Sequence, residues 1–163
     1  MDSFKFKRKK ILLLGSGELG KELVIEAKRL GLEVIAIDKY ENAPAMQVAD
    51  HSFVIDMSKK EILSKTIKEL NPDFVVPEIE ALSIESLKEL EEEGIKIVPN
   101  ARTVEITMNR DKIRDLASNV LKIKTAKFNY VFDYEDLEKK SDEIGFPLLL
   151  KPLMSSSGKG QSL

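Results

Sequence analysis

Short apolar segments alternate with amphipathic ones along the first hundred residues. Between the apolar segments, apolar residues recur every three or four positions, which predicts helices. Three of these helices end at residues that commonly terminate helices, namely Gly31, the Asn71-Pro72 pair and Gly94. The alternation predicts an α/β fold with a doubly wound, Rossmann-like parallel sheet. Its buried strands are expected at residues 11–14, 33–38, 52–56, 74–76 and 96–98. The apolar positions of the first helix are Leu19, Leu23, Ala27 and Leu30.

The pattern changes after Pro99. A helix is predicted over 104–121, a strand over 124–132, a short helix that ends at Gly145, and a strand over 146–152. A loop rich in serine and glycine follows, and no further element follows it to complete a second sheet. We therefore place a domain boundary near residue 120. The predicted parts are a basic N-terminal extension (1–10), a Rossmann-like domain (11–120) and an incomplete second domain (121–163).

Composition excludes several classes of site and partner. The 163 residues carry a net charge of -2 with both signs mixed, so we expect no nucleic-acid partner. The absence of cysteine excludes disulfides, thiolate metal sites and a cysteine nucleophile. The single histidine, His51, is interpreted as flanking a strand. No apolar run approaches the roughly 18 residues of a membrane helix, so we expect a cytoplasmic protein without a membrane partner.

The stretch GSGELG follows the first predicted strand. Glycines 15, 17 and 20 have the spacing of a dinucleotide-binding turn, and Asp38 ends the second strand about 20 residues later. An NAD-dependent oxidoreductase is therefore one reading, although Rossmann-like domains also keep such turns for packing alone. Glu18 argues against NAD, because a carboxylate at the mouth of the turn repels phosphate and suits an amine or a hydroxyl instead.

Two further acidic residues, Glu78 and Glu80, follow the fourth predicted strand. Ligands of open α/β sheets bind beyond the carboxyl ends of the strands, so Glu78 is expected in the same crevice as Glu18. The alternative is a helix N-terminal turn, where the helix dipole stabilises glutamate. A metal pair is a third reading, but no third ligand is apparent in the sequence.

The last segment, LLLKPLMSSSGKGQSL, combines a strand-end lysine with small residues. Lys151 ends the predicted strand, and the loop that follows offers backbone N–H groups suited to phosphate. It is not a Walker A loop, because Leu153 and Gly160 stand where glycine and Ser or Thr are required. A flexible linker is the alternative. Arg110, near the start of a helix, is placed to reach a phosphate or to lie on a solvated face.

Five segments in register resemble one family. GSGELGKE, AIDKYENAPAMQVAD, VPEIEAL, VPNARTVEITMNRDKIRDLA and GFPLLLKPLMSSSGKGQ are similar to the N-terminal portion of the formate-dependent phosphoribosylglycinamide formyltransferases of the ATP-grasp superfamily. The resemblance runs from about Lys10 to the last residue. It implies a Rossmann-like pre-ATP-grasp domain followed by the truncated start of an ATP-grasp domain. The related carboxyaminoimidazole ribonucleotide synthetases share this architecture.

The resemblance also implies a reaction. ATP and formate give formyl phosphate, which the amine of glycinamide ribonucleotide attacks, with Mg²⁺ required. Glu18, Leu19 and Glu78 then match positions that contact glycinamide ribonucleotide, whereas Asp38 has no certain role. Arg110 and Lys151 match ATP-contacting positions. A flap over the ATP phosphates is expected from Ser156, Ser157, Gly158, Lys159, Gly160 and Gln161. The family is expected to form homodimers.

One departure from the family concerns length. Family members are more than twice as long, so the magnesium ligands are expected in the missing C-terminal part and none in this chain. Without them the charge of a transferred phosphoryl group has no counter-ion, and we expect the 163-residue chain alone to be inactive. A non-catalytic substrate-binding module and one half of a split enzyme are the alternatives.

Overall fold

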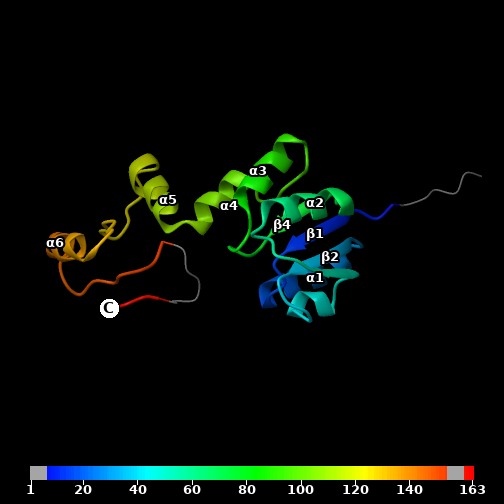
Figure 1. Cartoon of the computed structure of the whole chain (residues 1–163), viewed down its shortest axis with the longest axis horizontal. Helices are drawn as coiled ribbons and strands as arrows, with labels where there is room; N and C mark the ends of the chain where they lie inside the picture. Colours follow the sequence, from blue (N-terminus) through cyan, green and yellow to red (C-terminus); the bar gives the residue numbers. More distant parts are fainter. Residues whose placement is uncertain (1–6, 154–159) are drawn as a thin grey trace, which may run out of the picture. The chain divides into compact units, whose positions relative to one another are not determined.

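The computed structural model describes residues 7–153 and 160–163. The chain divides into two compact units, Met1–Val104 and Glu105–Leu163 (Figure 1). This division lies earlier in the chain than the boundary predicted near residue 120. Each unit is described by itself below.

The first unit contains a parallel sheet of four strands. They are β1 (Lys10–Leu14), β2 (Glu33–Asp38), β3 (His51–Val54) and β4 (Phe74–Pro77), in the order β3-β2-β1-β4. The central strand β1 pairs on both sides, with Leu14 opposite Ile37 of β2 and Pro77 of β4. The sheet confirms the predicted Rossmann-like α/β fold. Because β1 and β2 are buried on both faces, their inner residues are almost all apolar.

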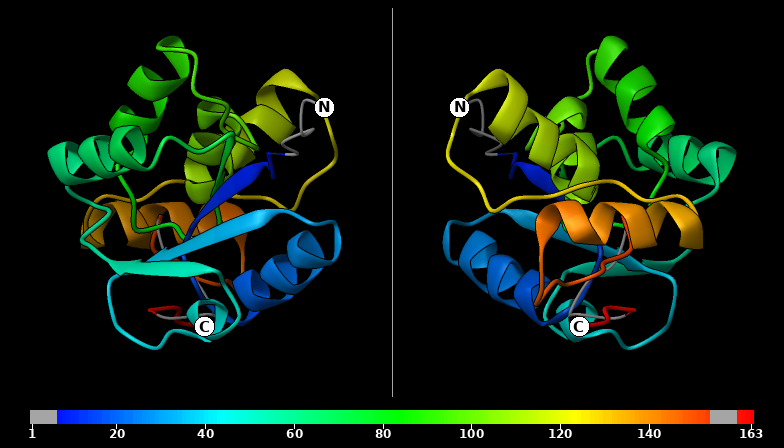
Figure 2. Two further views of the ribbon diagram at one scale, coloured as in Figure 1. Left: turned by 90° about the vertical axis from the view of Figure 1, so that its right-hand side faces the viewer. Right: turned by 90° about the vertical axis from the view of Figure 1, so that its left-hand side faces the viewer.

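Helices cover both faces of this sheet. Figure 2 shows α1 (Glu18–Arg29) on one side and α2 (Lys60–Leu70) with α3 (Ile84–Glu92) on the other. The buried residues of α1 are Gly20, Val24 and Ala27. Leu19 and Leu30, two of its predicted apolar positions, are 77% and 72% exposed. The buried face is rotated toward Gly20, which packs closely against the Gly15 carbonyl and Leu13, so that a larger residue there would be tightly packed.

The long loop after β2 packs onto the glycine turn. It contains the short 3₁₀ helix η1 (Pro44–Gln47), in which Ala45 is fully buried. The Ala45 N–H donates to the Ser16 carbonyl at 2.9 Å. This loop therefore closes one side of the turn that precedes α1.

The fifth predicted strand, 96–98, is reduced to one bridge between Val75 and Ile97. The Val75 N–H donates to the Lys96 carbonyl, and the Val98 N–H donates to the Val75 carbonyl. The next bond of a parallel ladder would need an N–H at Pro77, which proline lacks. The prediction of a full strand was therefore wrong for a local chemical reason.

The second unit is built from short helices. The helix predicted over 104–121 is split into α4 (Ala101–Met108), which spans the division, α5 (Arg110–Asp115) and a π-helical turn, η2 (Leu116–Val120). It breaks at Asn109, whose backbone is extended. The helix before Gly145 is confirmed as α6 (Tyr134–Ile144).

The two strands predicted in the second unit were wrong. Residues 124–132 form no strand, and 146–152 form only a bridge from Leu150 to Ser162. No described residue after Val104 is buried. A strand needs hydrogen-bonding neighbours and a face to bury, and the described residues of this unit provide only the Leu150–Ser162 bridge and no buried face.

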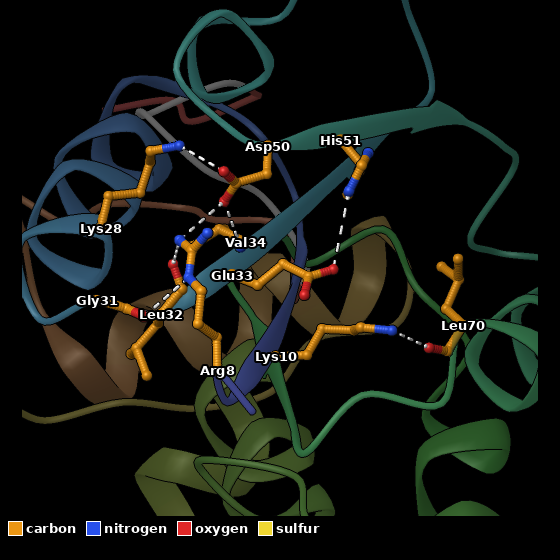
Figure 3. Close-up of polar contacts among 10 residues, drawn as sticks. All are labelled: Arg8, Lys10, Lys28, Gly31, Leu32, Glu33, Val34, Asp50, His51 and Leu70. Atoms are coloured by element: carbon orange, nitrogen blue, oxygen red, sulfur yellow. Dashed lines mark hydrogen bonds and ion pairs between the residues drawn. The ribbon is translucent and has the colours of Figure 1, made fainter. Parts of the chain in front are cut away.

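Basic residues just before and at the start of β1 hold the amino edge of the sheet together (Figure 3). The Arg8 guanidinium donates to the carbonyls of Gly31 and Leu32 at 3.1 and 2.7 Å, just beyond the end of α1. The Lys10 ammonium donates to the Leu70 carbonyl at 3.0 Å, at the end of α2. Cations are favoured at helix C-termini. Residues 8–10, predicted to belong to an N-terminal extension, thus form part of the fold.

Asp50 is the acceptor at the centre of the same edge. Its carboxylate accepts from the Val34 N–H at 2.9 Å and from the Lys28 ammonium at 2.7 Å. The hydrogen bond from Lys28, then that from Val34, holds the pKa of Asp50 below its ordinary value of 3.8. The ionised form is therefore the one that stabilises the fold.

Replacing this carboxylate is expected to weaken the first unit. Asp50→Asn should lower the free energy of unfolding at pH 7 by about 1–2 kcal/mol. Because the pKa of Asp50 is lowered on folding, the difference from wild type should be complete above the ordinary value of 3.8 and shrink as the pH falls below it. Urea denaturation at pH 7 and pH 3 measures both. Glu26→Gln, in the exposed pair with Arg29, is the control, and an equal loss there would contradict the interpretation.

Candidate functional site

The carboxyl ends of β1, β2 and β4 meet at one edge of the sheet, because Leu14 is in register with Ile37 and Pro77. The glycine turn follows β1, Asp38 ends β2 and Glu78 follows β4. Residues that are far apart in the sequence are thus brought together at the edge where open α/β sheets bind ligands.

The three glycines of the turn have different surroundings. Gly15 has a φ of +103°, which only glycine adopts readily, and its N–H donates to the Ile37 carbonyl. A Cβ at Gly20 would lie 3.1 Å from the Gly15 carbonyl. A Cβ at Gly17 would meet nothing within 4 Å. The backbone thus requires glycine at Gly15, and helix packing favours it at Gly20. At Gly17 the open space suits the approach of a ligand.

Glu78 lies over this turn. A Cβ on Gly15 would lie 2.8 Å from the Glu78 Oε2 atom, and the Glu78 N–H donates to the Leu14 carbonyl at 2.8 Å. Burial, followed by the negative charges of Glu80 and Asp38, raises the pKa of Glu78 above its ordinary value. The Glu78 side chain is exposed overall, but its carboxylate is repelled by the negative charges of Glu80 and Asp38, and a hydrogen-bond donor or a cation would offset this repulsion.

Two other predicted substrate residues begin the helix after this turn. Glu18 and Leu19 are exposed in the first turn of α1, and the N-cap residue that precedes this helix, Gly17, provides no side-chain cap. The first N–H groups of a helix have no partner within the helix. The edge therefore offers carboxylates and backbone donors together, a combination that suits a ligand with both donors and acceptors.

The arrangement disfavours a dinucleotide at this turn. Asp38, the acidic residue of the fingerprint, is 2% exposed, and its two oxygens accept from the Ser16 and Lys39 N–H groups, each at 2.7 Å. It is therefore committed to backbone and not to a ribose. The Glu78 carboxylate beside Gly15 would also repel a pyrophosphate. Within residues 7–153 and 160–163, no group of three His, Cys, Asp or Glu side chains could hold a metal ion.

A second candidate site lies within the second unit. An open pocket of about 290 Å³ contains two of the predicted ATP residues, Arg110 and Lys151; its lining is Arg110, Ile113, Arg114, Ala117, Thr125 and Lys151. Sequence reasoning missed Arg114, although it follows Arg110 by four residues and so shares its helix face. The Arg114 guanidinium stacks over the Phe128 ring at 5.8 Å, which fixes its orientation. The pocket combines cationic and apolar walls, as an adenine nucleotide requires.

The predicted phosphate flap is only partly described. Ser156, Ser157, Gly158 and Lys159 lie outside the described residues. Gly160 has a φ of +69° and lies against Pro152, and Gln161 precedes the Ser162 bridge to Leu150. The predicted role of these residues toward ATP stays a prediction. No helix in the described part of the chain has the length and apolar character needed to cross a membrane.

Comparison with known families identifies the first unit. Residues 8–108 match the family described as the ribonucleotide synthetase preATP-grasp domain. The chain belongs to this family. The match covers the parallel sheet, the glycine turn and Glu78, and it confirms that the Rossmann-like part of this preATP-grasp protein is a pre-ATP-grasp domain.

Individual relatives extend the similarity over the whole chain. The formate-dependent phosphoribosylglycinamide formyltransferase of Prochlorococcus marinus strain MED4 is 86% identical over all 163 residues, which span 42% of that protein. The solved structure of glycinamide-RNase-transformylase T from Mycobacterium tuberculosis is 42% identical over 76% of this chain and 38% of its own, with a TM-score of 0.73.

Another solved structure is similar in fold over more of the chain. It is carboxyaminoimidazole ribonucleotide synthase from Aspergillus clavatus complexed with ATP, with 28% identity over 95% of this chain and 41% of its own, and a TM-score of 0.84. The 86% identity to a formate-dependent phosphoribosylglycinamide formyltransferase confirms the resemblance to that group of enzymes. The preATP-grasp chain spans about two fifths of the length of the relatives it matches.

Proposed function

We propose that this chain forms the substrate-binding preATP-grasp portion, and the following segment, of a formate-dependent phosphoribosylglycinamide formyltransferase. Such an enzyme uses ATP and formate to formylate the amine of glycinamide ribonucleotide in purine biosynthesis. The observation that carries the proposal is the Glu78 carboxylate held over the glycine turn, in a chain 86% identical to a relative of that name. Cytoplasmic location and a homodimer are predictions from the same resemblance.

The crevice at the sheet edge is proposed to bind glycinamide ribonucleotide through Glu18, Leu19 and Glu78. Ribose hydroxyls and a glycinamide amine are hydrogen-bond donors, and ionised carboxylates only accept. A donor opposite Glu78 would compensate the burial and the repulsion that raise its pKa. Leu19, 77% exposed at the start of α1, would provide apolar contact and its backbone N–H.

The pocket of the second unit is proposed to bind ATP. Arg110 and Lys151 would hold the phosphates, while Ile113 and Ala117 offer an apolar wall to the base. When bound, ATP supplies the phosphoryl group that activates formate. The flap residues Ser156, Ser157, Gly158, Lys159, Gly160 and Gln161 would close over the phosphates and exclude water. Magnesium is part of this proposal, with its ligands expected in the part of the relatives that this chain does not cover.

The test is a binding and activity series with the 163-residue chain. We expect calorimetric titration to show binding of glycinamide ribonucleotide. We expect no formate- and ATP-dependent formylation by the chain alone. Formylation by the purified chain would refute the expectation of inactivity, and failure to bind glycinamide ribonucleotide would overturn the proposed role of the crevice. Retained affinity for glycinamide ribonucleotide together with failure to bind ATP would favour the alternative of a non-catalytic substrate-binding module. Activity on adding the remaining portion of a relative as a separate polypeptide would favour a split enzyme.

The ATP pocket gives a prediction of its own. Lys151→Ala should weaken ATP binding about tenfold, because a charge-assisted hydrogen bond to a phosphate is lost. Lys139→Ala removes an equal charge from the exposed side of α6 and is the matched control. Calorimetric titration with ATP measures both variants. Equal weakening by the two would show that net charge, and not this pocket, governs binding.

A further inference from the structure

Asp38 is a buried carboxylate that accepts hydrogen bonds from two backbone N–H groups. It ends β2 and is 2% exposed. Its Oδ2 atom accepts from the Ser16 N–H and its Oδ1 atom from the Lys39 N–H, each at 2.7 Å. Burial of an ionised carboxylate is costly unless hydrogen bonds satisfy it. Both oxygens of Asp38 are satisfied by the two segments that leave adjacent strands at the ligand-binding edge.

These bonds hold the glycine turn in one conformation. The Ser16 N–H is fixed by Asp38, while the Ser16 hydroxyl and the Gly15 N–H both donate to the Ile37 carbonyl, at 3.0 and 2.9 Å. The Ser16 carbonyl accepts from the Ala45 N–H on the other side. Ser16 is fully buried at the centre of these contacts. The turn is therefore attached to β2 and η1 before any ligand arrives.

The position of this turn determines how the groups at the proposed binding edge are arranged. Glu78 lies directly over Gly15, and the first turn of α1, with Glu18, begins two residues after Ser16. A displacement of Ser16 would move the floor beneath Glu78 and the start of α1 together. Asp38 also contributes a negative charge to the surroundings of Glu78, together with Glu80.

We propose that Asp38 is a positioning residue: by holding Ser16 against the end of β2, it presets the crevice so that Glu78 and the N-terminal turn of α1 face one ligand. Asp38 occupies the position at which the dinucleotide-binding pattern predicts a ribose ligand. In this proposal it acts instead through the backbone of the glycine turn. The affinity measurement below rests on the proposed binding of glycinamide ribonucleotide, whereas the amide-exchange measurement does not.

Asp38→Asn tests the proposal. Asparagine keeps one acceptor but turns an NH₂ donor toward the second backbone N–H, so one of the two contacts is lost. We expect amide exchange at Ser16 to accelerate at least about tenfold and affinity for glycinamide ribonucleotide to fall at least about tenfold. Asp56→Asn is the matched control, since Asp56 caps an exposed turn at Ser58 beyond the next strand, and it should change neither quantity.

The charge of Asp38 also predicts an effect on the pH dependence of glycinamide ribonucleotide binding. Glu80 and Asp38 both raise the pKa of Glu78. Removing the negative charge of Asp38 should therefore lower the pKa of Glu78, and the loss of glycinamide ribonucleotide affinity on acidification should occur at a lower pH. A purely structural defect would lower affinity equally at every pH. Unchanged affinity and unchanged Ser16 exchange in a folded Asp38→Asn variant would overturn the proposal.

A measurement on the wild-type chain covers the case in which the variant does not fold. Ser16 should already be protected from exchange without ligand, and glycinamide ribonucleotide should add little protection. Rapid exchange in the free chain, with protection gained only on binding, would show that the ligand and not Asp38 orders the turn. If wild type binds no glycinamide ribonucleotide, the proposed function fails, while protection of Ser16 still decides whether Asp38 holds the turn.

Discussion

Glu78→Gln should lower affinity for glycinamide ribonucleotide at least about tenfold, the loss of one charge-assisted hydrogen bond, without weakening the fold. Burial and the charges of Glu80 and Asp38 raise the pKa of Glu78. A carboxyl whose pKa is raised on folding stabilises the protein only while protonated, and this contribution is lost as the pH rises through the raised value. At pH 7 the ionised side chain adds a repulsion that a neutral amide removes, and the gain in stability should be small because the side chain is exposed. Stability should stay equal or increase.

Titration calorimetry and urea denaturation at pH 7 measure the two effects. Affinity of the wild-type chain should also fall as the pH drops toward the raised pKa of Glu78, above its ordinary value of 4.5, and this dependence should disappear in the variant. Glu80→Gln is the matched control on the same loop, and its smaller loss of affinity separates direct contact from general charge. If Glu78→Gln instead destabilises the fold and binds normally, the residue is structural and the proposed crevice is wrong.

Gly15→Ala should cause the larger loss of stability. Its φ of +103° is unfavourable for any residue with a Cβ, and the added atom would lie 2.8 Å from the Ile79 Cβ and 3.0 Å from the Ile79 backbone nitrogen. The backbone strain and the overlap together should cost about 2–4 kcal/mol. The Glu78 side chain, at 2.8 Å, can rotate away, but the strand-end backbone cannot. Chemical denaturation measures the loss.

Gly17→Ala, two residues later, is the matched comparison. Gly17 has a φ of -70° and open space around its Cα, so alanine should cost no more than about 0.5 kcal/mol as an N-cap replacement. A ligand that approaches this backbone should nevertheless bind more weakly to Gly17→Ala. Equal stability of the two variants would contradict the assignment of Gly15 to the turn and Gly17 to the ligand.

The first unit was largely predictable from sequence because its signals are local. Strands buried on both faces read as continuous apolar runs, and Gly31, Asn71 and Gly94 end helices through backbone conformations that the sequence reveals. The edge shared by the glycine turn and Glu78 followed from the order of strands and helices alone. The rotation of α1 toward Gly20 did not, because it depends on the distance between helix and strand.

The second unit was harder to predict for the opposite reason. Apolar stretches such as residues 124–132 and 146–152 fit strands by composition, but a strand exists only when a neighbouring strand accepts its hydrogen bonds. The described residues of this unit supply one bridge, at Leu150. Even so, the resemblance placed Arg110 and Lys151 at ATP positions, and both line one pocket.

The sequence by itself determined the α/β architecture and the family, because strand and helix periodicity and short motifs are properties of neighbours along the chain. Only the tertiary structure decided what Asp38 does. Its place at the end of β2 fits a ribose ligand and a backbone anchor equally well. The burial of Asp38 and its contact with Ser16, 22 residues earlier, select the anchor, because a carboxylate that is 2% exposed and already accepts from the Ser16 and Lys39 N–H groups is not available to a ligand.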